Sequence, residues 1–154
     1  MVGGEMMNKT MPIGVDDFKE VREKYYLVDK TDFIRQLIDV HSKVTLITRP
    51  RRFGKTLTMS MLEYFFSIDR EKDSQTLFQG LAIEAAGIDY MKHQNKSPVI
   101  FMTLKGAQND TWIGTYKSFR LFVQKEFQKH DYVLQGDCLK PSEKEFYQRI
   151  LNLE

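Results

Sequence analysis

The chain has 154 residues, enough for one domain with a buried core. Hydrophobic residues make up 42% and charged residues 29% of it, which is ordinary for a globular protein. The formal net charge of +2 is too small to indicate nucleic-acid binding by itself. The single cysteine, Cys138, excludes an internal disulfide framework and favours a reducing compartment.

The N-terminal segment, residues 1–12, is polar and is predicted to be a disordered tail. It lacks the apolar core of a signal peptide. Elsewhere, no apolar run approaches the roughly 18–20 residues that a membrane-spanning helix needs. These patterns predict a cytoplasmic protein without a membrane partner.

The first half of the chain shows a helix, a strand and a second helix. Thr31 is a candidate cap for a helix that runs to about Val40. Residues 43–48 form a nearly continuous apolar run, which is typical of a buried parallel strand. From Lys55 onward, apolar residues recur at helical spacing, with Leu57, Met61, Tyr64, Phe65 and Ile68 on the expected buried face.

The second half shows another strand and two more helices. Residues 98–104 read as a strand with Pro98 at its first position. Residues 112–129 read as a long amphipathic helix, whose Trp112 is expected to pack on the sheet. The last helix begins near Pro141, and the spacing of Ser142 and Glu145 is that of a capping box.

The chemistry-bearing segment lies between the first strand and the second helix and ends in Gly54-Lys55-Thr56. A strand, a basic loop and a helix start together make a phosphate cradle, because the first N–H groups of a helix point outward and its dipole favours an anion there. Lys55 can reach the outer phosphates, and the Thr56 hydroxyl can bind Mg²⁺. The segment therefore predicts binding of a nucleoside triphosphate.

This loop departs from the full phosphate-loop pattern at one position. The pattern G-x-x-x-x-G-K-[ST] begins with a glycine, and here that position holds Arg49. Arg51 and Arg52 make the loop unusually basic. The competing interpretation is a solvated basic turn before a helix, but the strand before the loop and the amphipathic helix after it favour the phosphate loop.

The wider sequence resembles the bacterial family of predicted AAA-ATPase-like proteins, from about Ile13 to the end. The run R-P-R-R-F-G-K-T is specific to that family, which itself carries arginine where the first glycine is expected. The segments that carry the resemblance are Tyr25–Thr31, Phe33-Ile34, Thr48–Thr56, Met61–Phe66, Leu77–Leu81 and Pro98–Ile100.

The resemblance implies an α/β fold of the P-loop NTPase type, with three α/β/α layers around a parallel sheet. Residues 13–154 would be the N-terminal part of that domain, and the sheet would be incomplete because the chain offers only two clear strands. It also implies ATP and Mg²⁺ as ligands and Thr56 as the metal ligand. The nucleotide-contacting residues would be Arg51, Arg52, Phe53, Gly54, Lys55, Thr56 and Leu57.

One half of the hydrolytic machinery has no counterpart in this sequence. ATP hydrolysis needs a carboxylate at the end of a neighbouring strand to hold the Mg²⁺ shell. The run from Val99 to Leu104 ends instead in Lys105, and Asp69 follows a helix. In the family that the chain resembles, this acid lies further along. The sequence thus predicts an ATP-binding module and leaves ATPase activity open.

Two other functions remain open at this level. The cations of the loop could hold a nucleic-acid backbone, or the chain could bind neither ligand and act as a truncated interaction remnant. The rest of the chain is charge-mixed, which favours the nucleotide over a nucleic acid. The expected partners are thus a nucleotide and, through the exposed sheet, either a second copy or the missing C-terminal half.

Overall fold

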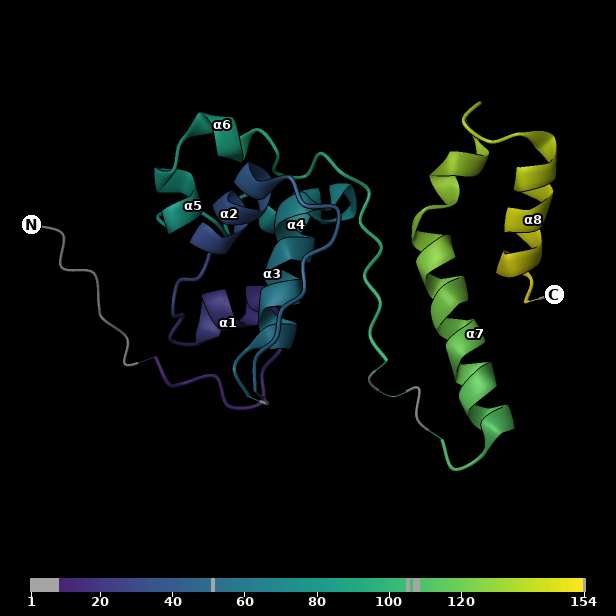
Figure 1. Cartoon of the computed structure of the whole chain (residues 1–154), viewed down its shortest axis with the longest axis horizontal. Coiled ribbons are helices and arrows are strands. Elements are labelled where there is room, and N and C mark those ends of the chain that lie inside the picture. Colours follow the sequence, from purple (N-terminus) through teal and green to yellow (C-terminus); the bar gives the residue numbers. More distant parts are fainter. Residues whose placement is uncertain (1–8, 51, 105, 107–108, 154) are drawn as a thin grey trace, which may run out of the picture. The chain divides into compact units, whose positions relative to one another are not determined.

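The computed structural model describes residues 9–50, 52–104, 106 and 109–153 and divides the chain into two units, residues 1–99 and 100–154 (Figure 1). In the first unit the helices are α1 (Phe18–Lys24), α2 (Asp32–Val40), α3 (Lys55–Phe66), η1 (Ile68–Arg70), α4 (Glu71–Ser74), α5 (Ala82–Ala85) and α6 (Ile88–Met91). In the second unit they are α7 (Trp112–Lys129), η2 (Asp131–Leu134) and α8 (Pro141–Leu151).

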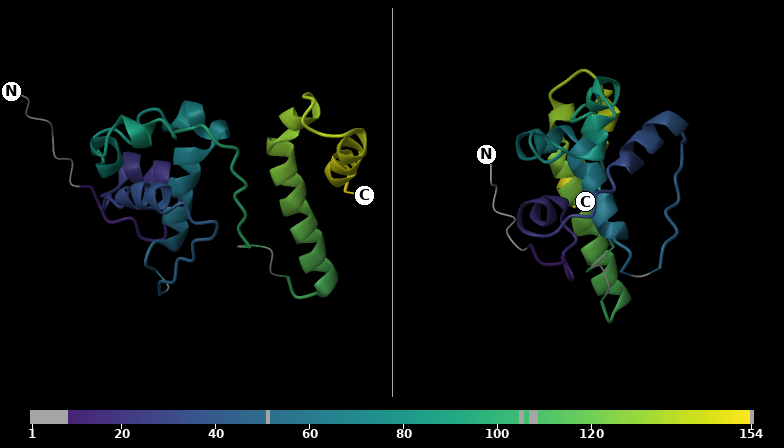
Figure 2. Two further views of the ribbon diagram at one scale, coloured as in Figure 1. Left: turned by 45° about the horizontal axis from the view of Figure 1, so that its top comes forward. Right: turned by 90° about the vertical axis from the view of Figure 1, so that its left-hand side faces the viewer.

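The predicted α/β fold with a parallel sheet is wrong: the described residues form helices and loops and contain no strand. Their β-pairing is an isolated parallel bridge between Ser67 and Ser97. Residues 43–48 form part of a long open loop between α2 and α3, which Figure 2 shows from two sides. Val44 is 85% and Leu46 82% exposed, so the predicted buried strand is a solvent-exposed segment.

The second predicted strand, residues 98–104, is likewise not a strand in the described structure. Alternate side chains Ile100, Met102 and Leu104 are exposed. The backbone N–H of Phe101 donates to the Glu126 carboxylate at 3.3 Å, not to a neighbouring strand. An apolar sequence can favour an extended backbone, but a sheet forms only where another strand satisfies its N–H and C=O groups.

The core of the first unit is an aromatic cluster around α3. The Phe65 ring meets the Phe78 ring edge-on at 5.1 Å between centroids, and Phe18 stacks on Phe78 at 5.3 Å. All three side chains are at most 1% exposed. Ile34 of α2 and Met61 of α3 join the same cluster. Burial of these large apolar surfaces is the main favourable term that holds α1, α2 and α3 together.

α1 lies beside α3 (Figure 1), and polar contacts hold the two helices together. The backbone N–H of Phe18 donates to Ser60 Oγ at 3.0 Å, and the Tyr64 hydroxyl donates to Asp17 at 3.0 Å. Burial and the Asp17 carboxylate raise the pKa of Tyr64 to about 12, so this hydroxyl stays protonated and remains a donor. These bonds fix the orientation of α1 on α3. Hydrophobic packing alone would leave α1 free to rotate.

Asn95 ties the C-terminal end of α3 to the segments that follow it. Its side-chain Nδ2 donates to the carbonyls of Tyr64 at 3.3 Å and Ser67 at 2.7 Å, and its Oδ1 accepts from the Ser74 hydroxyl at 2.7 Å. Its backbone N–H donates to the Phe65 carbonyl at 2.8 Å. Carbonyls at the end of a helix lack donors from the next turn, and this one buried side chain donates to the carbonyls of Tyr64 and Ser67.

In the second unit α7 and α8 pack side by side. The predicted bounds of α7, residues 112–129, are confirmed. Trp112 does not pack on a sheet: it is 78% exposed and stacks on Tyr116. The capping box expected at Ser142 and Glu145 is also wrong, because it lies two residues earlier: the Glu143 carboxylate accepts from the Lys140 backbone N–H at 2.7 Å.

We expect Asn95→Ala to lower the free energy of unfolding of the first unit by about 2–3 kcal/mol, because three side-chain hydrogen bonds are lost in a buried position. Asn95 has a φ of 55°, so Asn95→Gly separates the lost bonds from backbone strain and should cost slightly less. Urea unfolding measures both, with Gln75→Ala on the exposed surface as control. A cost for Asn95→Ala no larger than the control's would contradict the role of Asn95 as a tie.

Candidate functional site

The candidate site is the loop that enters α3. Gly54 is the residue before the helix and has a φ of 72°, in the left-handed region that side chains with a Cβ rarely adopt. Arg52 has a φ of 68°, so the chain makes two left-handed steps within three residues. Glycine at position 54 therefore has a conformational reason: it lets the loop turn sharply into the helix.

The Lys55 ammonium folds back onto its own loop. Its Nζ donates to the Pro50 carbonyl at 2.9 Å and also to the Arg49 carbonyl. The side chain is half-buried, and the described residues give it no carboxylate partner. Backbone carbonyls carry only partial charge, so phosphate oxygens would be stronger acceptors for this ammonium.

The first turn of α3 presents polar groups at the same place. Thr56 is exposed, whereas Leu57 is partly buried and packs against the aromatic core. No side chain caps this helix start, and its first N–H groups lie outside the helical ladder. The positive end of the helix dipole adds to the charge of Lys55, so the helix start favours an anion.

Two further residues predicted for the site, Arg52 and Phe53, are described by the structure, and one is not. Arg52 and Phe53 are exposed, and Arg51 lies outside the described residues. Among the described residues no group of three His, Cys, Asp or Glu side chains is arranged to hold a metal ion. Thr56 as a Mg²⁺ ligand therefore stays a prediction.

Sequence reasoning left the turn before α2 without a role, and the structure gives it one. One Asp29 oxygen accepts from the Thr31 backbone N–H at 2.8 Å and from the Thr31 hydroxyl at 2.7 Å. The other oxygen accepts from the Ala82 N–H at 2.7 Å. The Thr31 hydroxyl also accepts from the Ile83 N–H at 3.1 Å, and the Thr31 residue is fully buried. Thr31 stands at the N-cap position of α2, but its hydroxyl accepts from an N–H of α5 and does not cap α2.

This turn places Lys30 beside the loop. Lys30 Nζ lies 3.7 Å from the point where a Cβ on Gly54 would stand. The turn and the loop are far apart in sequence, and the fold brings them together. The spacing of charges in the sequence gives no direct signal of it.

Burial by itself would raise the pKa of the Asp29 carboxyl, but the hydrogen bonds from Thr31 and Ala82 stabilise the carboxylate and lower its pKa overall. Asp29 is therefore ionised at neutral pH. The hydrogen bonds that its carboxylate accepts hold the turn in place, so Asp29 has a structural role.

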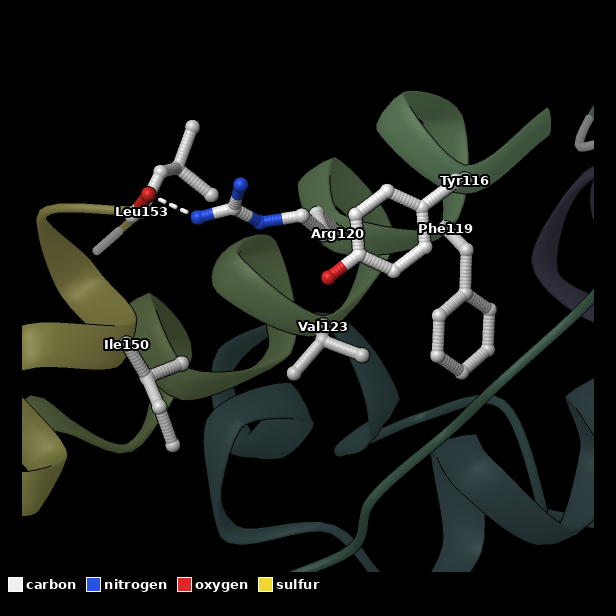
Figure 3. Close-up of a pocket in the computed structure, with 6 residues that line it drawn as sticks. All are labelled: Tyr116, Phe119, Arg120, Val123, Ile150 and Leu153. Atoms are coloured by element: carbon white, nitrogen blue, oxygen red, sulfur yellow. Dashed lines mark hydrogen bonds between the residues drawn. The ribbon is translucent and has the colours of Figure 1, made fainter. Parts of the chain in front are cut away.

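The second unit holds a separate apolar hollow, shown in Figure 3, with a volume of about 210 Å³. Arg120 is its charged residue, and its guanidinium donates to the Leu153 carbonyl and lies over the Tyr116 ring. The lining is otherwise apolar or aromatic and offers no pair of groups for catalysis. The lining residues are Tyr116, Phe119, Arg120, Val123, Ile150 and Leu153.

Comparison with known protein families identifies the family of this chain. A sequence profile described as "Predicted AAA-ATPase" matches residues 12–153. The chain belongs to the predicted AAA-ATPase family. The match extends over both structural units, and membership in an ATPase-like family indicates nucleotide use.

One curated relative is an uncharacterized protein from the vnfD 5' region of Azotobacter chroococcum mcd 1. It is 36% identical over 104 residues, which cover 66% of this chain and 18% of the relative. The chain thus spans less than a fifth of that relative's length. No solved structure matches the chain. Among the described residues, no helix is both long and apolar enough to cross a membrane.

The lowered pKa of Asp29 predicts a pH-dependent contribution to stability. A folded-state pKa below the ordinary value of 3.8 gives stability that is present above that value and is lost as pH falls through the folded pKa. At pH 7 we expect Asp29→Asn to lower the Tm by roughly 4–8 °C, the shift that about 1 kcal/mol produces in a unit of this size.

Thermal unfolding from pH 7 to pH 3 measures the difference between wild type and Asp29→Asn. The difference should shrink below pH 3.8. Asp89→Asn, at a carboxylate whose side chain is 84% exposed, is the matched control. A difference for Asp29→Asn that stays constant across the range would show that the carboxylate charge does not hold the turn.

Proposed function

We propose that this member of the predicted AAA-ATPase family binds ATP–Mg²⁺ at residues 51–57. The observation that supports this most directly is the Lys55 ammonium at the uncapped start of α3, hydrogen-bonded to carbonyls of its own loop. This is a cation and a helix dipole at one point without a counter-ion among the described residues. Family membership supplies the class of anion that would belong there.

The proposed roles follow from the positions of the groups. Phosphate oxygens would replace the carbonyls of Arg49 and Pro50 as acceptors for Lys55, because charge-assisted hydrogen bonds are stronger than neutral ones. The Thr56 hydroxyl, exposed on the first turn, would bind the Mg²⁺ that accompanies the phosphates. Arg52 would add charge at the rim of the loop.

The core supports this function by keeping the helix start in place. Leu57 is partly buried against the same cluster that contains Met61 and Phe65. The first turn of α3 therefore continues directly into the core of the unit. A rigid helix start keeps its N–H groups directed at one compact anion, which suits phosphates better than a flexible basic loop would.

We expect Lys55→Ala to weaken Mg²⁺-ATP binding by about tenfold or more, because one charge-assisted hydrogen bond is worth roughly 1.5–3 kcal/mol. Isothermal titration calorimetry measures the affinity. Lys72→Ala, which removes an exposed lysine of α4, is the matched control and should bind like wild type. Equal affinities for wild type and Lys55→Ala would remove the proposed phosphate loop.

We further expect this chain to bind ATP without turning it over, because its sequence offers no apolar run that ends in a catalytic carboxylate. A phosphate-release assay with Mg²⁺-ATP should give the same rate for wild type and for Lys55→Ala. Phosphate release that depends on Lys55 would show that a carboxylate elsewhere completes the catalytic site.

A further inference from the structure

We propose that Lys30 is a second phosphate-binding lysine of this site. The inference rests on the proposed function, since it assigns a further residue to the same bound triphosphate. The ligand chemistry it predicts is a chain of several phosphates, which needs more than one cation to balance its charge.

The position of Lys30 is the first step. Its Nζ lies 3.7 Å from the point where a Cβ on Gly54 would stand, so the ammonium sits directly beside the backbone that leads into α3. Lys55, the next residue, carries the other ammonium of the loop. Lys30 comes from the turn before α2, so two different elements bring lysines to the same helix start.

The backbone of Lys30 is held on both sides. Asp29 bonds to Thr31 and to the N–H of Ala82, and Thr31 bonds to the N–H of Ile83. Thr31 is fully buried, whereas Lys30, which lies between Asp29 and Thr31, is exposed. The fold therefore fixes the base of this lysine while leaving its ammonium accessible, which reduces the entropy lost when it binds an anion.

The charges near Lys30 are the second step. Both Asp29 oxygens are occupied by the hydrogen bonds of the turn, and Asp32 pairs with Arg35 and Gln36. The described structure gives the Lys30 ammonium neither a carboxylate within ion-pair distance nor a hydrogen-bond acceptor. An ammonium beside the residue that precedes the positive end of a helix, in a loop that carries a further lysine, is electrostatically unfavourable unless an anion binds there.

The consequence is a preference for longer phosphate chains. A triphosphate carries more charge than a monophosphate and is long enough to meet two ammonium groups, whereas a monophosphate can be held by Lys55 and the helix start alone. Lysine suits this role, since its ammonium is a compact point charge on a flexible stem. Lys30 would thus contribute to the selection of ATP over AMP.

Binding measurements on three lysine variants test the role of Lys30. Lys30→Gln removes the charge, Lys30→Arg keeps it, and Lys72→Gln is the control at an exposed lysine away from the loop. Calorimetry with Mg²⁺-ATP, AMP and inorganic tripolyphosphate gives the affinities, and circular dichroism confirms that each variant is folded. We expect Lys30→Gln to weaken ATP and tripolyphosphate binding by about tenfold and AMP binding much less, with Lys30→Arg close to wild type.

The outcomes separate this inference from the proposed function. If wild type binds ATP in a Lys55-dependent way but Lys30→Gln binds like Lys72→Gln, the assignment of Lys30 is wrong and the proposed function stands. If wild type binds neither ATP nor tripolyphosphate, both are wrong. An equal loss for ATP and AMP would overturn the role in phosphate-chain length.

Chemical labelling of lysines provides a readout that does not depend on affinity changes. Wild-type protein is acetylated with and without saturating Mg²⁺-ATP, and peptide mass spectrometry follows each site. We expect ATP to protect Lys30 and Lys55 and to leave Lys72 unchanged. Protection of Lys55 without protection of Lys30 would place Lys30 outside the bound phosphates.

Discussion

The contact of Phe65 with Phe78 is the interaction on which the first unit depends. Phe65 lies near the end of α3, and Phe78 brings the chain beyond α4 back onto that helix, where Phe18 of α1 completes the cluster. Without this burial the short helices would have little to hold them, because helices of four residues are not stable alone. The cluster thus determines where α3 lies and, through α3, where the candidate loop begins.

The polar contacts around the core have a different role from the aromatic contacts. Asn95 and the pair Asp17–Tyr64 add specific directions to packing that is otherwise non-directional. The buried Glu63 carboxylate is balanced by Arg70, whose guanidinium also lies over the Tyr64 ring. These bonds align the C-terminal end of α3, while its N-terminal end is left uncapped and facing the basic loop.

The candidate site and its support come from separate parts of the sequence. Gly54 and Lys55 belong to the loop, whereas Lys30 reaches it from a turn whose geometry depends on Asp29, Thr31 and the start of α5. If phosphates bind there as proposed, a site built this way would couple their binding to the core contacts of α2, α3 and α5. Segments 43–48 and 98–104 are largely exposed and are not strands in the described structure, although their sequences favour an extended backbone.

The sequence by itself determined the family, the basic loop and the long helices. The bounds of α7 and the start of α3 could be predicted because a helix closes its hydrogen bonds within its own segment, and its apolar period is visible locally. Only the tertiary structure decided that the two apolar runs are not strands in the described residues, since a strand depends on a distant partner strand for its hydrogen bonds. The proximity of Lys30 to Gly54 was decided in the same way, because it follows from packing between elements and leaves no periodic mark in the sequence.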